Sequence, residues 1–304
     1  MRSEALRTEL RALLGRRVAF DEPLSRHTSL RVGGPADALA RIDSREELLR
    51  IQHWCRDRGV GCWVVGSGFN TLAREEGVRG LVLRLSGLRR VERLDGGSLR
   101  AEAGATHTQV IRFCEQAALT GLEFGAGIPG TVGGWVAMNA GIREREMGDV
   151  LHAVEYAEPS GEGCFALARE ELSFEYRCTH LPDGAVVVAA TFETRPGEPE
   201  RIRAATRAQL EQRRASQPVD RLSCGSVFKN PPGDHAGRLI EAANLKGLRV
   251  GGAEVSEVHA NFFVNRGEAT ADDVLELIGH VRERVLQHAG LCLETEVRVL
   301  GGAT

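Results

Sequence analysis

The sequence has almost no lysine: Lys229 and Lys246 are the only two among 39 cationic residues, and all the others are arginine. Glycine is in excess, with 36 of 304 residues, which is about 12% where about 7% is usual. Glycine, alanine and arginine rise together in GC-rich genomes, so codon bias explains part of this excess. The glycines carry functional information only where they gather at particular places in the chain.

Several absences exclude whole classes of protein. No apolar run approaches the ~18 residues of a membrane span, and residues 1–17 are charged and helix-like, without a signal-peptide core. A net charge of −3 provides no basic surface for nucleic acid. The seven cysteines are odd in number and form no C-x-x-C, and no H-E-x-x-H occurs. We therefore expect reduced thiols, a cytoplasmic location, no metal site, no membrane or nucleic-acid partner, and no obligate protein partner.

Capping residues and apolar periodicity predict the secondary structure. Helices are expected over residues 44–58, 106–119, 200–216 and 270–289, and strands over 62–65, 81–85, 185–189 and 291–300. We expect the strand at 62–65 to be buried, because all four of its residues are apolar. In the last strand, alternation places four apolar residues on one face, Leu291, Leu293, Val297 and Val299, and Glu294, Glu296 and Arg298 on the other. The mixture of proline, glycine and charge at 195–199 is typical of a domain boundary.

Two glycine clusters stand out from the codon bias. Seven glycines fall between Gly121 and Gly141, and Gly66-Ser67-Gly68-Phe69-Asn70 follows the expected strand at 62–65. The second cluster fails the dinucleotide fingerprint G-x-G-x-x-G, because Thr71 stands where a glycine is needed. Walker and G-x-S-x-G patterns are absent. The clusters are either phosphate-binding loops, in which backbone N–H groups face the ligand, or irregular structural loops.

Two short segments hold candidate reacting groups. Tyr176-Arg177 places a guanidinium beside an aromatic ring, where it can pair with a carboxylate or phosphate or lie on the surface. The segment from Gly225 to Pro231 presents the Ser226 hydroxyl on a glycine turn, followed within four residues by one of the two lysines and by an asparagine.

Six blocks, in this order, resemble one family. They are residues 28–37 (TSLRVGGPAD), 66–70 (GSGFN), 127–134 (GIPGTVGG), 176–177 (YR), 225–231 (GSVFKNP) and 251–265 (GGA through N). Together they are similar to the UDP-N-acetylenolpyruvoylglucosamine reductase family, in its shorter form that lacks a tyrosine-bearing insertion, over about residues 20–301.

The resemblance implies an α+β fold. Residues 1–196 would form an FAD-binding domain of the vanillyl-alcohol-oxidase type, with two subdomains split near 86–90. Residues 197–304 would form a smaller α/β substrate-binding domain. The activity implied is FAD-dependent, NADPH-driven reduction of UDP-N-acetylglucosamine enolpyruvate to UDP-N-acetylmuramate. That reaction belongs to peptidoglycan precursor synthesis, and so to cell-wall biogenesis, cell shape and cell division.

The resemblance also implies roles for particular residues. Arg177, Ser226 and Glu296 would be catalytic, with Glu296 distinguished from Glu294 by the Glu-Val-Arg pattern before the final strand. Substrate contacts would come from four residues, Tyr176, Lys229, Asn230 and His259. Non-covalent FAD would be held by the two glycine loops, through Gly66, Ser67, Gly68, Phe69, Asn70, Gly130, Thr131, Gly133 and Gly134.

Four departures from the family pattern, and two rival readings, remain. Phe69 replaces a usual serine, Trp135 a small residue, Ile142-Arg143-Glu144 a short Tyr/His-Gly stretch, and Val258 a common lysine. The first three are expected to alter flavin packing and the last to weaken a phosphate contact.

One rival is an oxidase or dehydrogenase of the same fold that attaches flavin covalently, with Cys62 and His107 in the flavin half. The other is a nucleotide-sugar-binding protein without a cofactor.

Overall fold

The computed structural model describes residues 3–142 and 145–301, and the chain forms two compact units. Unit 1 comprises Met1–Ala19, Ala38–Gly66 and Gly80–Gln212. Unit 2 comprises Phe20–Asp37, Ser67–Arg79 and Arg213–Thr304. Two N-terminal segments thus belong to the unit that contains the C-terminal third. The division of the chain at residue 196 stays a prediction about domains.

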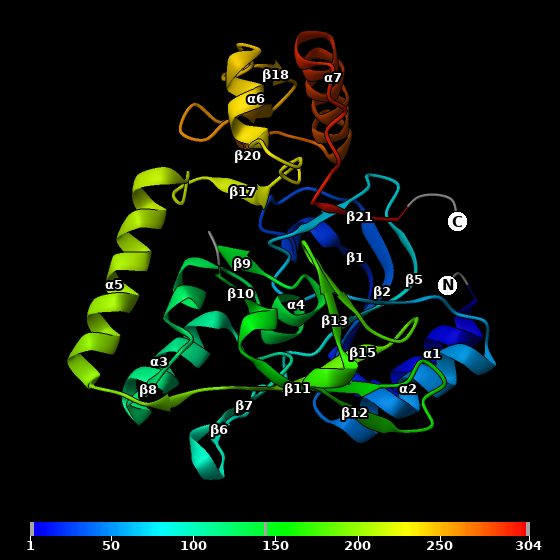
Figure 1. Ribbon diagram of the computed structural model, residues 1–304. Helices are drawn as coiled ribbons and strands as arrows, with labels where there is room; N and C mark the ends of the chain where they lie inside the picture. Colours follow the sequence, from blue (N-terminus) through cyan, green and yellow to red (C-terminus); the bar gives the residue numbers. More distant parts are fainter. Residues whose placement is uncertain (1–2, 143–144, 302–304) are drawn as a thin grey trace. The chain divides into compact units, whose positions relative to one another are not determined.

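Three of the helices with residues in unit 1 begin within one residue of a predicted helix, one lies in the N-terminal segment expected to be helix-like, and the short helix at 132–137 was not predicted. These helices are α1 (Glu4–Leu14), α2 (Arg45–Asp57), α3 (His107–Ala117) and α4 (Val132–Ala137), while α5 (Pro199–Ser216) starts in unit 1 and ends in unit 2. Ser44 Oγ accepts the Glu47 N–H and caps α2, and Thr106 and Gln109 cap α3 reciprocally. Helices α1 and α2 lie side by side (Figure 1), joined by the Trp54 indole, which donates to Glu9 at 2.9 Å.

A five-stranded antiparallel sheet forms the larger sheet of unit 1. Its order is β12–β11–β15–β7–β6, with bounds Cys164–Ala168, Leu151–Ala157, Val186–Phe192, Leu99–Glu102 and Val91–Arg93. The four-stranded sheet has the order β1–β2–β5–β3, with bounds Val18–Pro23, Pro35–Arg41, Val78–Arg84 and Cys62–Val64. Strand β3 exists as predicted, but its predicted burial is wrong. It lies at the sheet edge, and Val64 is 43% exposed.

Short elements complete unit 1. Two-stranded pairs are β8 (Leu119–Thr120) with β16 (Arg195–Pro196), β9 (Gly141–Ile142) with β10 (Arg145–Glu146), and β13 (Ser173–Glu175) with β14 (Cys178–His180). Short 3-10 helices span Gly15–Arg17, Leu24–Arg26, Asp95–Gly97, Glu123–Gly127, Met147–Asp149 and Arg169–Glu171, of which Leu24–Arg26 belongs to unit 2.

Unit 2 is built on an antiparallel sheet in the order β17–β20–β19–β18. The bounds are Leu222–Ser226, Phe262–Asn265, Ala253–Val255 and Arg249–Val250. Helices α6 (Ala236–Ala242) and α7 (Ala271–Ala289) share its core. The predicted apolar stripe of α7 is buried from Val274 to Val285, but Leu286 is 48% exposed. Leu30, Val32 and Leu72 join the same core, which explains why their segments belong to unit 2.

The predicted strand over 291–300 is wrong for most of its length. Only β21 (Arg298–Leu300) is a strand, and it pairs in parallel with β4 (Thr71–Ala73). Leu293 and Val297 are buried, but Leu291 and Val299 are each 40% exposed. Alternation fails because residues 294–297 bond to the loop after β17 rather than to a continuous strand.

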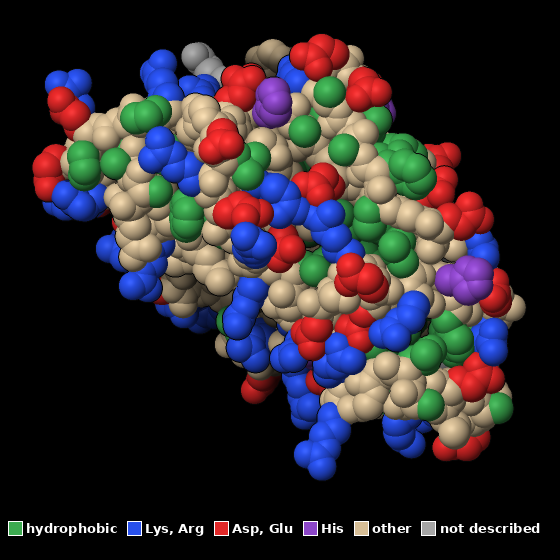
Figure 2. Space-filling model, turned by 90° about the horizontal axis from the view of Figure 1, so that it is seen from below, with side chains coloured by type: hydrophobic (Ala, Val, Ile, Leu, Met, Phe, Trp, Pro, Cys, Tyr) green, Lys and Arg blue, Asp and Glu red, His purple; other side chains and the backbone are tan. Residues whose placement is uncertain are grey.

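Charged side chains of both signs are interspersed over the face seen in Figure 2. Many form ion pairs, such as Arg100 with Glu155 at 2.6 Å. In the described part of the chain, no helix is long and apolar enough to cross a membrane.

Candidate functional site

Ser226 lies at the end of β17, directly after a glycine in a left-handed conformation. Gly225 has φ 78°, which favours glycine, and the pairing of β17 with β20 shifts register between Ser223 and Ser226. This bulge interrupts the regular pleat just before Ser226, whose partner is Phe262. The predicted glycine turn before Ser226 is therefore confirmed.

The segment carrying Glu296 is bonded to the residue that follows Ser226. Val227 O accepts the N–H groups of Glu296 at 2.8 Å and of Val297 at 3.3 Å. Asn70 Nδ2 donates to Glu296 O at 3.1 Å. Burial, with a smaller contribution from the Glu296 carboxylate, raises the pKa of Cys224 to about 12, so this carboxylate lies near the strand that ends at Ser226. The backbone segments that carry two predicted catalytic residues, Ser226 and Glu296, are thus hydrogen-bonded to each other within unit 2.

Glu294 has different surroundings from Glu296. Its side chain is 72% exposed and accepts a hydrogen bond from Lys229 Nζ at 2.6 Å, while its backbone oxygen accepts the Lys229 N–H at 2.8 Å. Glu296 is half-buried. Lys229, a predicted substrate contact, is therefore an ion-pair partner of Glu294.

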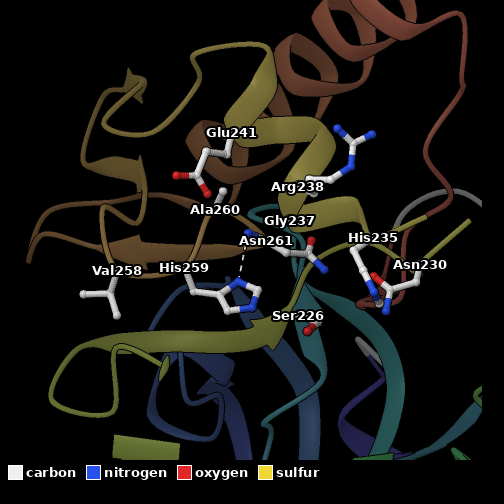
Figure 3. A pocket seen from close by; sticks show the side chains of 10 residues that line it. All are labelled: Ser226, Asn230, His235, Gly237, Arg238, Glu241, Val258, His259, Ala260 and Asn261. Carbon is white, nitrogen blue, oxygen red and sulfur yellow. Dashed lines mark hydrogen bonds between the residues drawn. The ribbon is translucent and has the colours of Figure 1, made fainter. Parts of the chain in front are cut away.

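Next to Ser226 is a cavity of about 350 Å³ within unit 2. Figure 3 shows the ten residues that line it, which are Ser226, Asn230, His235, Gly237, Arg238, Glu241, Val258, His259, Ala260 and Asn261. Three of them, Ser226, Asn230 and His259, were predicted as site residues. Asn230 Oδ1 accepts the Ala236 N–H at the start of α6.

The His259 ring is fixed in one orientation. Its Nδ1 accepts the Asn261 N–H at 3.2 Å, and its ring meets Phe262 edge-on, with centroids 4.9 Å apart. Burial lowers the pKa of His259. Because Nδ1 accepts, the neutral ring carries its proton on Nε2 and is a hydrogen-bond donor there. Val258, where the family commonly has lysine, is 55% exposed at this cavity.

Tyr176 and Arg177 form the tip of the β13–β14 hairpin of unit 1. Arg177 has φ 62°, and its guanidinium lies over the Tyr176 ring, 4.6 Å from the centroid. Asn139 Nδ2 donates to Glu175 O at 3.2 Å, and Thr179 Oγ1 donates to Val136 O at 2.6 Å. Asn139 is fully buried and was not predicted as a site residue. The glycine-rich run that contains it was the available signal.

The two predicted phosphate loops meet inside unit 1. A Cβ on Gly66 would lie 2.5 Å from Thr131 Oγ1, so this close approach requires glycine. The Val132 and Gly133 N–H groups donate to Ala105 O and Ala103 O, each at 2.9 Å. Gly133 therefore allows a ligand to approach the backbone closely, but its own N–H is already bonded within the protein. Adjacent loops of small residues fit a diphosphate, which the backbone approaches closely.

The rest of the first loop belongs to unit 2. Gly68 has φ 72°, a Cβ there would lie 2.3 Å from His27 O, and its carbonyl accepts the Ser29 N–H at 3.1 Å. Ser67 and Phe69 are half-buried, and the Phe69 carbonyl oxygen would be 3.5 Å from a Cβ on Gly225. Asn70 was predicted to contact cofactor, and the structure gives it a further role as anchor of the Glu296 segment.

The departures from the family pattern are packed locally. Trp135 is 1% exposed, donates from Nε1 to Ile128 O at 3.0 Å, and fills the space above Gly125. Ile142 Cδ1 would be 3.2 Å from a Cβ on Gly127, and residues 143–144 lie outside the described residues. These contacts explain how a large residue is accommodated at 135.

The groups invoked for a covalent flavin lie outside the glycine loops. Cys62 is exposed in β3. His107 is the first residue of α3, and its N–H donates to Gly130 O at 3.0 Å. Among residues 3–142 and 145–301, no three His, Cys, Asp or Glu side chains are grouped to hold a metal ion.

Comparisons with known proteins identify the family. Residues 36–164 match the family described as FAD binding domain, and residues 217–300 match the C-terminal domain of UDP-N-acetylenolpyruvoylglucosamine reductase. The reductase of Moorella thermoacetica is 47% identical over 297 residues, covering 98% of each chain. The reductase of Rubrobacter xylanophilus is 48% identical over 285 residues, covering 93% of this chain and 95% of the relative.

A solved structure shows the same fold. The crystal structure of the reductase from Thermus caldophilus superposes with a TM-score of 0.80 at 39% identity, over 93% of this chain and 98% of that one. The predicted α+β, FAD-binding fold and the predicted flavin oxidoreductase class are confirmed. The chain belongs to the UDP-N-acetylenolpyruvoylglucosamine reductase family.

Proposed function

We propose that the chain reduces UDP-N-acetylglucosamine enolpyruvate to UDP-N-acetylmuramate, with FAD as cofactor and NADPH as reductant, in the cytoplasm. One observation carries the proposal: Val227 joins the Ser226 turn to the Glu296 segment through two hydrogen bonds. The full-length similarity to named reductases supports the substrate. The cysteines of the chain are free thiols, which supports a reducing compartment.

The substrate is an enol ether conjugated to a carboxylate. The chemistry that FAD would supply when bound is hydride addition to the terminal carbon of this enol ether, with NADPH as the source of the hydride. The π electrons of the double bond then move to the adjacent carbon and the carboxylate, and that carbon must take up a proton. The protein's task is to stabilise this charge and deliver the proton.

Ser226 donates the proton from its Oγ. A serine hydroxyl is a weak acid, but an enediolate is a strong base, so the transfer is favourable. The bulge at Gly225 fixes the hydroxyl at the end of a strand rather than on a mobile loop. Glu296 orients or protonates the substrate carboxylate.

Arg177 supplies a fixed positive charge for the developing enediolate. A guanidinium pairs with a carboxylate through two parallel hydrogen bonds, which is the geometry a planar enediolate presents. The Tyr176 ring under the guanidinium and the Asn139 bond to Glu175 O restrict the hairpin tip. Tyr176 is 43% exposed and is proposed to contact substrate.

The sugar nucleotide is proposed to occupy the cavity of unit 2. Asn230 and His259 line it, and His259 offers a donor at Nε2 for a phosphate or hydroxyl oxygen. Lys229, held by Glu294, is the further contact proposed.

FAD is proposed to bind without a covalent bond. In unit 1 the diphosphate would lie against Gly66 and residues 130–134, where Gly130 has φ 136° and Thr131 keeps its hydroxyl out of the cap of α4. Residues 67–70 continue the same loop.

A spectrum and a coupled assay test the proposal. The purified protein should show flavin absorbance, acid precipitation should leave that flavin in the supernatant, and NADPH oxidation should require the enolpyruvyl sugar nucleotide. Flavin in the pellet would instead favour a covalent oxidase or dehydrogenase. A colourless protein that FAD does not reconstitute would favour a nucleotide-sugar-binding protein.

A further inference from the structure

Asn261 makes four hydrogen bonds that join the two sides of the unit 2 cavity. Its Oδ1 accepts the Phe228 N–H at 2.9 Å, and its Nδ2 donates to Phe228 O at 2.8 Å. Its backbone oxygen accepts the Val227 N–H at 2.9 Å, and its N–H donates to His259 Nδ1 at 3.2 Å. The side chain is 3% exposed.

These bonds replace a strand ladder where the ladder has been interrupted. The pairing of β17 with β20 is irregular at Ser226, and β17 ends there. Beyond that point the Asn261 amide pairs with both backbone polar groups of Phe228, as a neighbouring strand would. Val227 lies between Ser226 and Phe228, and its carbonyl oxygen accepts the hydrogen bonds from the backbone of the Glu296 segment.

The same residue fixes the His259 ring. The Asn261 N–H occupies Nδ1, which leaves Nε2 as the donor of the neutral ring. Gly237 of α6 confines the ring from the other side, since a Cβ there would lie 3.2 Å from His259 Cε1. Figure 3 shows Asn261 between His259 and Asn230, above Ser226.

We propose that Asn261 is a positioning residue: it holds the Ser226 hydroxyl and the His259 Nε2 donor in fixed positions relative to each other. This inference rests on the proposed function, since it concerns the step in which Ser226 gives its proton. Asn261 does not itself exchange a proton, and it acts through the backbone of residues 227–228.

Asn261→Asp is the informative variant. The aspartate keeps an acceptor for the Phe228 N–H, but as a carboxylate it faces Phe228 O without a hydrogen. When protonated, the same side chain donates to Phe228 O and restores the pair. A buried carboxyl group beside a carbonyl oxygen has a raised pKa, so this restoration falls in an accessible pH range.

Asn265→Asp is the matched control. Asn265 lies in the same strand region, is 7% exposed, and also donates from Nδ2 to a backbone oxygen, that of Leu30, at 3.0 Å. Asn265→Asp replaces an amide with a carboxyl group, as Asn261→Asp does, and lies in the same unit. The Asn265 amide bonds go to Leu30, Gly267 and Ala269, not to the Ser226 turn.

The experiment measures the two half-reactions of the FAD-loaded protein separately. Flavin reduction by NADPH should be unchanged in Asn261→Asp. Reoxidation by the enolpyruvyl sugar nucleotide should fall about 10- to 100-fold near pH 8, because displacements of about 1 Å have effects of this size. The ratio to wild type should recover toward pH 5.5, and Asn261→Ala should show no such recovery.

Other titratable groups are removed from the comparison by taking ratios to wild type and to Asn265→Asp at each pH. The titratable and charged groups around position 261 are Glu296, Lys229, His259, His235, Arg238, Glu241 and Lys246. Equal loss of both half-reactions, a defect no larger than that of Asn265→Asp, or a ratio independent of pH would each overturn the inference. A wild-type protein that fails to oxidise NADPH with substrate would instead refute the proposed function.

Discussion

Replacing Gly134 with alanine is expected to change folding stability and FAD affinity in opposite directions. Gly134 lies exposed in α4, without a positive φ, and a Cβ there would meet only Thr131 Oγ1, at an ordinary 3.7 Å. The protein itself therefore has room for alanine. In a helix the change should stabilise the apo chain by about 0.5–1 kcal/mol, because alanine loses less backbone entropy on folding.

FAD binding should move in the opposite direction. If the diphosphate contacts the backbone at residue 134, a methyl group there pushes it away and lengthens a charge-assisted hydrogen bond. Loss of one such bond is about 1.5–3 kcal/mol, which corresponds to a roughly 10- to 150-fold increase in Kd. Quenching of FAD fluorescence on titration with apoprotein measures this Kd, and urea unfolding of the apoprotein measures its stability.

Gly279→Ala provides the matched control. Gly279 lies in α7, where a Cβ would meet nothing within 4 Å, so the same helical gain is expected without any change in Kd. An unchanged Kd in Gly134→Ala would show that the cofactor does not approach this backbone. A destabilised Gly134→Ala apoprotein would show that the protein has no room for a methyl group at position 134.

Further predictions concern the reacting residues. Ser226→Ala should leave flavin reduction by NADPH intact and slow substrate reduction by several orders of magnitude, and equal loss of both would refute the role of Ser226. Glu296→Gln should lower kcat for substrate reduction about 10²- to 10³-fold, as loss of one transition-state contact does. Glu294→Gln, which breaks only the exposed pair with Lys229, should change kcat less than about fivefold, and the reverse order would refute the assignment. Burial lowers the pKa of His259, so the unfolded chain binds the proton more readily, and native stability should decrease as the pH falls below 6.5. Urea unfolding of His259→Gln between pH 7 and 5 should show a smaller decrease, and an identical decrease would exclude this residue as the cause.

The sequence predicted the longer helices α2, α3, α5 and α7 well because their signals are local, but it missed the short helices α4 and α6. Ser44, Thr106 and Thr270 each accept a backbone N–H three residues ahead, so both partners of the bond lie in one window of sequence. The apolar stripe of α7 extends the same logic through helical periodicity.

Strand burial was predicted less well because it depends on distant partners. Val64 is exposed since β3 ends a sheet, and sheet order is set by segments elsewhere in the chain. Leu291 and Val299 are exposed since the residues between them bond to the loop at 227–229. Alternation alone does not identify which neighbour covers a face.

The positioning residues are the part of the site that sequence reasoning missed. Asn261 bonds to a residue 33 positions away, and the Asn70 side chain bonds to one 226 positions away. An asparagine that pairs with distant backbone has no local pattern. The resemblance included both within its blocks, but it assigned Asn70 to the cofactor and gave Asn261 no role.

The glycines can now be divided by the physical reason for each. A Cβ on Gly68 or Gly104 would lie within 2.3 Å of a backbone oxygen, so packing alone requires glycine there. Gly290 ends α7 in the left-handed conformation and needs no further explanation. Gly134 and Gly279 have neither a clash nor a positive φ, so the fold does not require glycine at either position. Codon bias suffices for Gly279, whereas Gly134 lies one turn from Thr131 and the close contact with Gly66. A glycine that the fold does not need, beside one that it does, is the pattern expected where an absent side chain leaves room for a ligand.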